Sequence, residues 1–135
     1  MIRAPRGLIV PEPSVDTQWW WDALGEGRIT MPCCEACRRR FFPPQPFCPW
    51  CGSASWCAVE PDGRGSVYSW IVAHRAFAPQ FAKDTPYAVV AVDLVDGGRL
   101  IGRYLGDPMD LRPDLPVACR IYHVQKTSLL GFACV

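Results

Sequence analysis

After residue 65, hydrophobic and polar positions follow the pattern of short β-strands separated by turns. Alternation with a period of two is typical of a strand with one buried face, and short apolar runs bounded by glycine or proline are typical of buried strands. Five such runs occur, at 66–75, 87–94, 99–105, 117–123 and 129–133. Five short strands with glycine bends predict a small closed barrel of the OB-fold type.

Two of these runs carry more detailed expectations. In the first, alternation places Tyr68, Trp70 and Val72 on one face of the strand. The run 87–94 is nearly continuous in apolar residues, which predicts a strand covered on both sides. The sequence Asp96-Gly97-Gly98 follows it and predicts a hairpin turn into the next strand.

The N-terminal part of the chain contains one predicted helix, over 15–26, with Ser14 or Asp16 as its cap. Its apolar content includes three adjacent tryptophans, Trp19–Trp21. At 3.6 residues per turn, three adjacent side chains span about 200°, so they cannot all face one small core. We expect at least one ring on the surface or against another chain, and favour a helix that packs on its own domain.

Composition and charge exclude several classes of protein. With 135 residues, 50% hydrophobic and 20% charged, the chain is large enough for a folded core, and 14 prolines disfavour a helical bundle. A net charge of +1 argues against a non-specific nucleic-acid binder. The longest clean apolar run, 87–92, is too short for a membrane helix, and 7–10 is too short for a signal-peptide core. We therefore expect a cytosolic protein.

The strongest chemical signal is a pair of Cys-x-x-Cys motifs, Cys34/Cys37 and Cys48/Cys51. Two thiolates on one tight turn bind one side of an ion, and a second such turn completes the tetrahedron that Zn²⁺ prefers. This spacing predicts a rubredoxin-like zinc ribbon, with iron as the minor alternative. Four protein ligands leave no position for water, so the zinc is expected to be structural.

The remaining cysteines are expected to lie outside the metal site. Cys33 could replace Cys34 only if the first motif became Cys-x-x-x-Cys. Cys57 and Cys134 are assigned as spare thiols, and Cys119 as a small buried residue of a strand.

Other candidate sites are weaker. His74 and His123 stand beside no recognisable catalytic motif, so structural histidines are favoured. The basic run Arg38–Arg40 is interpreted as solvated, with contact to an anion or an acidic partner as the alternative.

The segment 76–86 mixes aromatic and cationic residues that could hold a nucleotide-like ligand by stacking and charge. Together with the preceding arginine, the candidates are Arg75, Phe77, Phe81 and Lys83. Taken alone, an ordinary loop with phenylalanines that cover the barrel is the simpler interpretation.

From about residue 15 onward the motifs together resemble one family. They are Trp20-Trp21-Asp22-Ala23-Leu24, Cys34-x-x-Cys37, Phe42-Pro43-Pro44, Cys48-Pro49-x-Cys51-Gly52-Ser53, Gly63-Arg64-Gly65-Ser66-Val67-Tyr68-Ser69, His74-Arg75 and Pro86-Tyr87. The chain is similar to the zinc-ribbon and OB-fold proteins associated with acyl-CoA enzymes, a family long catalogued as a domain of unknown function. Arg38 stands where that family usually has glycine, and Gln45 where it often has arginine.

The resemblance implies a non-catalytic subunit that pairs with a thiolase-fold enzyme, such as a thiolase, an acyltransferase or a steroid side-chain aldolase. A hydratase of the MaoC type is the alternative partner. The resemblance further implies that such a subunit bridges or stabilises the partner and helps to form its acyl-CoA site, while the catalytic residues would belong to the partner.

Taken together, the sequence predicts a mainly β protein with an N-terminal arm, helix and zinc ribbon over 1–58 and an OB-fold domain over 59–135. The expected function is that of an accessory subunit in a hetero-oligomer, such as a heterotetramer, for acyl-CoA chemistry of the kind used in steroid side-chain degradation. The tryptophans and the ribbon are expected to present apolar surface to the partner. Two other hypotheses stay open: a single-stranded nucleic-acid module, and an independent enzyme that uses Cys57 or His74.

Overall fold

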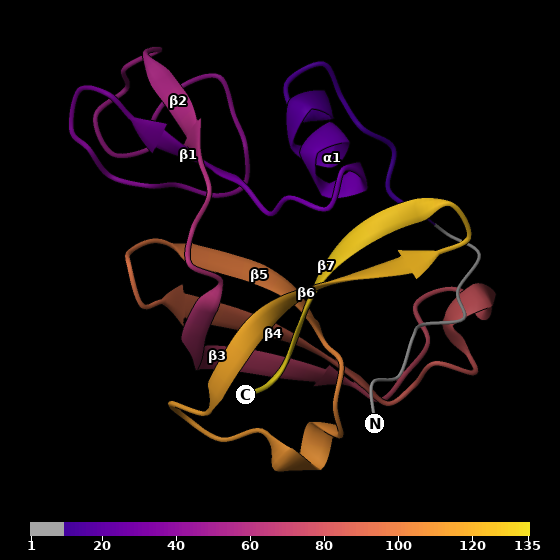
Figure 1. Ribbon diagram of the computed structural model, residues 1–135. Coiled ribbons are helices and arrows are strands. Elements are labelled where there is room, and N and C mark those ends of the chain that lie inside the picture. The colour runs from indigo at the N-terminus through magenta and orange to yellow at the C-terminus, as the bar shows by residue number, and fades with distance from the viewer. Residues whose placement is uncertain (1–9) are drawn as a thin grey trace.

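The computed structural model describes residues 10–135 and contains two parts, a helix with a small ribbon and a barrel (Figure 1). The first part consists of α1 (Gln18–Gly25), β1 (Met31–Cys34) and β2 (Trp56–Val59). The barrel strands are β3 (Arg64–Ala73), β4 (Tyr87–Leu94), β5 (Arg99–Tyr104), β6 (Pro116–Val124) and β7 (Thr127–Cys134). Two short 3₁₀ turns, Pro79–Phe81 and Pro108–Asp110, lie in the loops after β3 and β5.

The five barrel strands close in the order β3-β4-β5-β7-β6, and β6 pairs back with β3. All neighbouring pairs are antiparallel except β5 and β7, which run parallel. One parallel pair within a closed five-stranded barrel is the Greek-key arrangement of an OB-fold. The predicted fold class, a helix and ribbon followed by an OB-fold barrel, is confirmed.

The first barrel strand does not alternate as the sequence pattern predicted. Its pairing with β4 shifts register between Val67 and Ser69, so a β-bulge lies at Tyr68. A bulge adds one residue to one strand and reverses which side chains face inward beyond it. Val67 is buried and Trp70 and Val72 pack against the core, whereas Tyr68 is 58% exposed. The prediction that Tyr68 shares a face with Trp70 and Val72 was therefore wrong.

The strand β4 follows its predicted bounds but is covered less completely than expected. Val90 and Val92 are fully buried in the barrel core, while Val89 and Ala91, on the other face, are only half-buried. The hairpin at 96–98 forms as predicted, with the N–H of Leu94 donating to the Gly98 carbonyl at 3.0 Å. Because Val89 and Ala91 keep part of their surface exposed, the apolar run reflects a strand that is fully buried on one side only.

The helix α1 is shorter than predicted and is not capped by a side chain. Its N-cap is Thr17, and neither Ser14 nor Asp16 caps it. The Ser14 carbonyl accepts the N–H groups of Thr17 and Gln18, and the hydroxyls of Ser14 and Thr17 lie 3.1 Å apart. The hydroxyl that could cap the helix is therefore engaged with Thr17.

The three tryptophans of α1 pack on the protein's own core. Trp20 is 5% exposed, and its Nε1–H donates to the Thr30 carbonyl at 2.7 Å. Trp19 and Trp21 are half-buried, with ring centroids 5.0 Å from Trp56 and 4.8 Å from Trp20 respectively. The helix thus packs on its own domain, as favoured from the sequence. The expectation that these rings offer an apolar surface to a partner is wrong for buried Trp20.

Within residues 10–135, neither α1 nor the 3₁₀ turns could cross a lipid bilayer, because none is long and apolar enough.

Candidate metal centre

Two equivalent turns bring the four predicted cysteines together. The first turn begins at Cys34, the last residue of β1, and the backbone nitrogen of Cys37 lies 3.4 Å from Cys34 Sγ. The second turn begins at Cys48, and the backbone nitrogen of Trp50 lies 3.4 Å from Cys48 Sγ. The residue after each Cys-x-x-Cys pair has a positive φ, 67° at Arg38 and 79° at Gly52. The departure noted at Arg38 therefore places a side chain in a backbone region that glycine adopts more easily, at a cost of about 1 kcal/mol.

The sulfur geometry fits one tetrahedral ion. All four Sγ atoms lie within 4.8 Å of one another, and the Cys34–Cys51 and Cys37–Cys48 sulfur distances are 3.6 and 3.7 Å. Four sulfurs at about 2.3 Å from zinc lie about 3.8 Å apart at the corners of a tetrahedron. The four cysteines are thus positioned to bind a metal ion, and a ring of four thiolates closes its coordination shell.

The environment of Cys34 favours its ionised form. The backbone N–H of Cys37 points at its sulfur and, against the effect of burial, lowers the pKa of the Cys34 thiol to about 6. A thiolate is the form that binds a metal ion. In the same turn, and against the effect of the Arg39 N–H, burial and the neighbouring sulfurs raise the pKa of Cys37 to about 11. Of these two thiols, only Cys34 thus favours the ionised form before a metal ion binds.

The ribbon has very little apolar core of its own. Its cluster of buried residues consists of Cys34, Phe41 and Cys48, with Cys37 and Trp56 packed against it. Two of those three buried residues are metal-site cysteines. A metal ion at the four sulfurs would accordingly hold together a segment that hydrophobic packing alone hardly stabilises.

The other cysteines lie away from the four sulfurs. Cys33 is next to Cys34, yet its Sγ lies 3.6 Å from the Arg38 carbonyl oxygen. Its register partner across the ribbon is Cys57, which is exposed. Cys119 is buried in β6, and burial raises its pKa to about 11.

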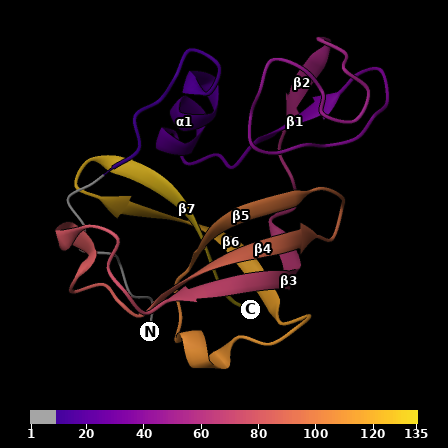
Figure 2. The same cartoon turned by 180° about the vertical axis from the view of Figure 1, so that it is seen from behind.

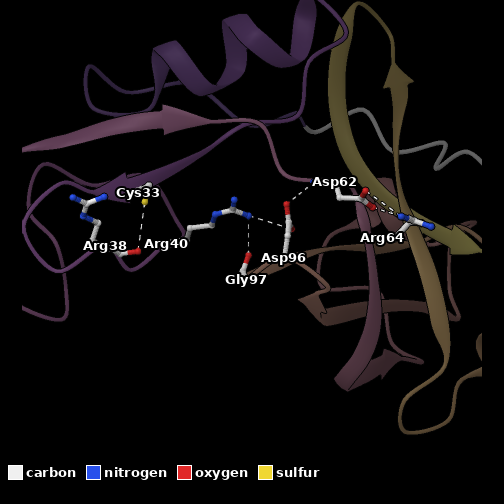
Figure 3. A network of polar contacts seen from close by, with 7 residues as sticks. All are labelled: Cys33, Arg38, Arg40, Asp62, Arg64, Asp96 and Gly97. Carbon is white, nitrogen blue, oxygen red and sulfur yellow. Dashed lines mark hydrogen bonds and ion pairs between the residues drawn. The ribbon is translucent and has the colours of Figure 1, made fainter.

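A polar network joins the ribbon to the barrel (Figure 3). The Arg40 guanidinium, from the ribbon, donates to the Gly97 carbonyl at 3.2 Å and lies 3.1 Å from an Asp96 carboxylate oxygen. The other Asp96 oxygen accepts the N–H of Asp62 at 3.0 Å, and Asp62 pairs with Arg64 at the start of β3. These contacts connect the β4–β5 hairpin, the ribbon and the linker between the two parts.

The predicted acyl-CoA contacts share one loop, between β3 and β4, at the end of the barrel away from the ribbon (Figures 1 and 2). Arg75 and Lys83 are exposed, and Phe77 is 79% exposed. Phe81 is half-buried and packs against Tyr87, with ring centroids 6.2 Å apart.

An ion pair that sequence reasoning missed anchors this loop. Asp84, 2% exposed, accepts a hydrogen bond from Arg103 of β5 at 2.7 Å. The Arg103 guanidinium also lies 4.8 Å from the centre of the Tyr87 ring. Nothing in the local pattern around an acidic loop residue marks it as buried.

The two histidines are both exposed, and they stand apart from the metal site. His123 Nδ1 lies 3.2 Å from the Ser128 hydroxyl across the β6–β7 pair. His74 follows the end of β3.

Comparison with known proteins agrees with this architecture. Residues 21–56 match the family described as "ChsH2, rubredoxin-like zinc ribbon domain", and residues 58–121 match "ChsH2, C-terminal OB-fold domain". A solved chain of "Ltp2-ChsH2(DUF35) aldolase" is 35% identical, with a TM-score of 0.79 over 93% of this chain and 98% of that one. The chain belongs to the ChsH2 family. The resemblance drawn from the sequence motifs is thereby confirmed.

Two curated relatives of this ChsH2 chain are longer proteins. A "Probable enoyl-CoA hydratase alpha subunit" of Thermomonospora curvata is 41% identical over 98 residues, which is 71% of this chain and 30% of that protein. The "3-oxo-4,17-pregnadiene-20-carboxyl-CoA hydratase alpha subunit" of Mycobacterium tuberculosis is 30% identical over 131 residues, 95% of this chain and 40% of that protein. The chain therefore spans less than half the length of either relative.

A more distant solved structure shares the fold. It is a DUF35-family protein of unknown function from Sulfolobus solfataricus, 16% identical, with a TM-score of 0.59 over 90% of this chain and 87% of that one.

Proposed function

We propose that this chain is a non-catalytic accessory subunit of a thiolase-fold acyl-CoA enzyme that forms or cleaves a C–C bond, as in steroid side-chain degradation. The observation that carries the proposal is the similarity, over 93% of this chain and 98% of the other, to a ChsH2 chain of an aldolase. Against the hydratase subunits the chain aligns with only 30% and 40% of each protein. The aldolase-associated chain is thus the relative whose own length this chain spans almost completely.

The chemistry of the metal site supports an accessory role. Four cysteines fill the tetrahedral shell of Zn²⁺, so the ion offers no position to a substrate carbonyl or to water. In this proposal zinc stabilises the ribbon, and the partner subunit supplies the nucleophile and the acid–base groups.

The partner surface of the ribbon consists of aromatic side chains at its tip. Phe47 is 57% exposed and Trp50 is 61% exposed, in contrast to the packed tryptophans of α1. Exposed aromatic rings near arginines are typical of the centre of a protein interface. In this proposal these rings contact the partner together with the half-buried Trp19 and Trp21, and buried Trp20 takes no part.

The acyl-CoA contacts of the proposal are the four loop residues Arg75, Phe77, Phe81 and Lys83. Two exposed cations suit the phosphates of CoA, and two phenylalanines suit its apolar pantetheine arm. The buried Asp84–Arg103 ion pair would keep this loop in place while the partner completes the site.

The test is co-expression of the chain with a thiolase-like protein encoded by a neighbouring reading frame. We expect a stable hetero-oligomer by light scattering, and acyl-CoA cleavage or condensation only when both chains are present. The double variant Arg75→Ala, Lys83→Ala should raise the partner's KM for acyl-CoA about tenfold and leave the complex intact. Arg112→Ala with Lys126→Ala, which removes the same two exposed side-chain types elsewhere, serves as the matched control.

A hydratase partner is the second candidate, because two relatives carry the name of enoyl-CoA hydratase alpha subunits. Co-expression with a MaoC-like neighbour and hydration of an enoyl-CoA would favour it over the thiolase-fold partner. Turnover of an acyl-CoA by the lone chain would contradict both. Salt-sensitive binding of single-stranded oligonucleotides would instead favour the nucleic-acid hypothesis.

A further inference from the structure

Two cysteines outside the metal site face each other across the ribbon. Cys33 of β1 and Cys57 of β2 are register partners in this antiparallel pair, so their side chains lie on the same face. All eight cysteines lie within the described residues, and the other two outside the metal site, Cys119 and Cys134, are not partners of each other. The fold therefore sets apart one pair of thiols that stand opposite each other.

The spacing of the two ribbon strands suits a disulfide at this pair. Two residues further along the ribbon, the Glu35 N–H donates to the Ser55 carbonyl at 2.9 Å. Because pair types alternate along an antiparallel ladder, Cys33 and Cys57 also form a hydrogen-bonded pair, in which Cα atoms are about 5.5 Å apart. The Cα atoms of disulfide-bonded cysteines are most often about 5.5–6 Å apart. A bond between the two sulfurs thus requires little movement of the backbone.

The Cys33 sulfur is held only weakly, and the Cys57 sulfur is accessible. Cys33 Sγ lies 3.6 Å from the Arg38 carbonyl oxygen (Figure 3) and 3.9 Å from that of Cys34. A thiol is a weak hydrogen-bond donor, so little is lost when Cys33 rotates toward the opposite strand. Cys57 is exposed on β2, an outer strand of the ribbon, where a small oxidant can reach it.

The pair also encloses the whole metal-binding segment of the chain. The four metal-site cysteines all lie between positions 33 and 57. A disulfide between these two positions would close the segment into a loop, and loop closure lowers the conformational entropy of the opened segment. The ribbon has few buried apolar residues of its own, so it has much to gain from such a cross-link. Oxidation of this pair is thereby linked to retention of the metal.

We propose that Cys33 and Cys57 form a reversible disulfide, with a small disulfide such as oxidised glutathione as the oxidant. The Cys57 sulfur attacks the glutathione disulfide, which releases one glutathione thiol and leaves a mixed disulfide on Cys57. The Cys33 sulfur then attacks the Cys57 sulfur and releases the second glutathione thiol. The two protein thiols lose two electrons and two protons, which the glutathione disulfide gains. The resulting cross-link holds the ribbon closed and slows the loss of its metal ion.

The test is treatment of the zinc-loaded full chain with oxidised glutathione, followed by peptide mass spectrometry without reduction. We expect one disulfide within the chain, between Cys33 and Cys57, which dithiothreitol reverses. Cys33→Ser should stop at a glutathione adduct on Cys57, because the second thiol is missing. Cys57→Ser should form no disulfide within the chain. Cys134→Ser removes another exposed thiol outside the metal site and, as the matched control, should form the same disulfide as wild type.

The rate of zinc loss tests the consequence of the cross-link. During dialysis against a chelator, oxidised wild type should lose zinc at least about tenfold more slowly than reduced wild type. Cys33→Ser and Cys57→Ser should lose zinc at one rate whether or not they were treated with oxidised glutathione. The proposal is overturned if the disulfide joins metal-site cysteines, if Cys33 and Cys57 stay unlinked, or if oxidation leaves the rate of zinc loss unchanged. None of these measurements uses a partner enzyme or acyl-CoA, so failure of the proposed accessory function would leave them unaffected.

Discussion

Cys33 and Cys34 are adjacent on β1, yet only the replacement of Cys34 by serine should abolish zinc binding. The replacement of Cys33 by serine should leave zinc binding intact. Cys34 Sγ lies 3.6 Å from Cys51 Sγ in the cluster of four sulfurs. Cys33 Sγ lies 3.6 Å from the Arg38 carbonyl oxygen and outside that cluster. Both substitutions exchange a sulfur for a hydroxyl of similar size, so a difference between them reports metal binding.

The size of the expected difference follows from the small ribbon core. Phe41 is the one large apolar side chain in the ribbon's buried cluster, and its burial contributes about 1.5–3 kcal/mol. A structural zinc ion in a small peptide contributes about 10–16 kcal/mol. Removing one of the four thiolates should therefore lower zinc affinity by more than the roughly 10–100-fold typical of losing an outer partner of a ligand. Cys33→Ser should change stability by less than about 1 kcal/mol.

The assay is zinc content by mass spectrometry after dialysis against a competing chelator, with hydrogen exchange as the structural readout. Wild type and Cys33→Ser should retain one zinc per chain, and Cys34→Ser should retain almost none. Amides of residues 34–51 should then exchange rapidly in Cys34→Ser, while β3–β7 stay protected because the barrel has a separate core. Equal zinc retention by the two variants would refute the assignment of Cys34 as a ligand.

Three other predictions concern the barrel. Gly65→Ala should destabilise the protein by about 1–3 kcal/mol in urea unfolding, because the added Cβ collides with the Asp93 carbonyl oxygen. Asp84→Asn should cost about 3–5 kcal/mol, since it leaves the Arg103 guanidinium, with 11% side-chain exposure, without its carboxylate. Cys119, whose pKa burial raises to about 11, stays a protonated thiol at pH 8, so iodoacetamide should modify it only after unfolding, as judged by peptide mass spectrometry.

Each of these has a matched control. Gly25→Ala adds a methyl group where nothing lies within 4 Å, and should change stability little. Arg64→Ala breaks an ion pair whose side chains are 67% and 36% exposed, and should cost at most about 1 kcal/mol. Exposed Cys57 should be alkylated rapidly in the folded protein. A loss as large in the Arg64 variant as in Asp84→Asn, or fast labelling of Cys119, would contradict the burial argument.

The parts of the structure that local sequence determines were predicted well. A Cys-x-x-Cys turn places its two thiols on one side by its own backbone geometry, so Cys34, Cys37, Cys48 and Cys51 could be grouped from spacing. The hairpin at 96–98 likewise depends on two successive glycines with positive φ. Strand existence was also predictable, because a period-two pattern arises within each strand.

The failures share a different physical cause. The bulge at Tyr68 depends on how β3 pairs with β4, and period-two alternation within one strand carries no information about it. The burial of Asp84 depends on Arg103, a residue of another strand. The burial of Trp20, whose indole N–H donates to the Thr30 carbonyl, depends on a residue beyond the helix.

By itself, the amino-acid sequence determined the five barrel strands, the hairpin at 96–98 and which four thiols can share an ion, because those properties depend on neighbouring residues and on backbone geometry. Only the tertiary structure decided that Arg40 and Arg99 form ion pairs, whereas within residues 10–135 Arg38 and Arg39 have none and Arg39 lies beside Trp50. Charge pairing depends on distances across the space between the ribbon and the β4–β5 hairpin. Those distances exist only once the hairpin has packed at Gly98 on Met31.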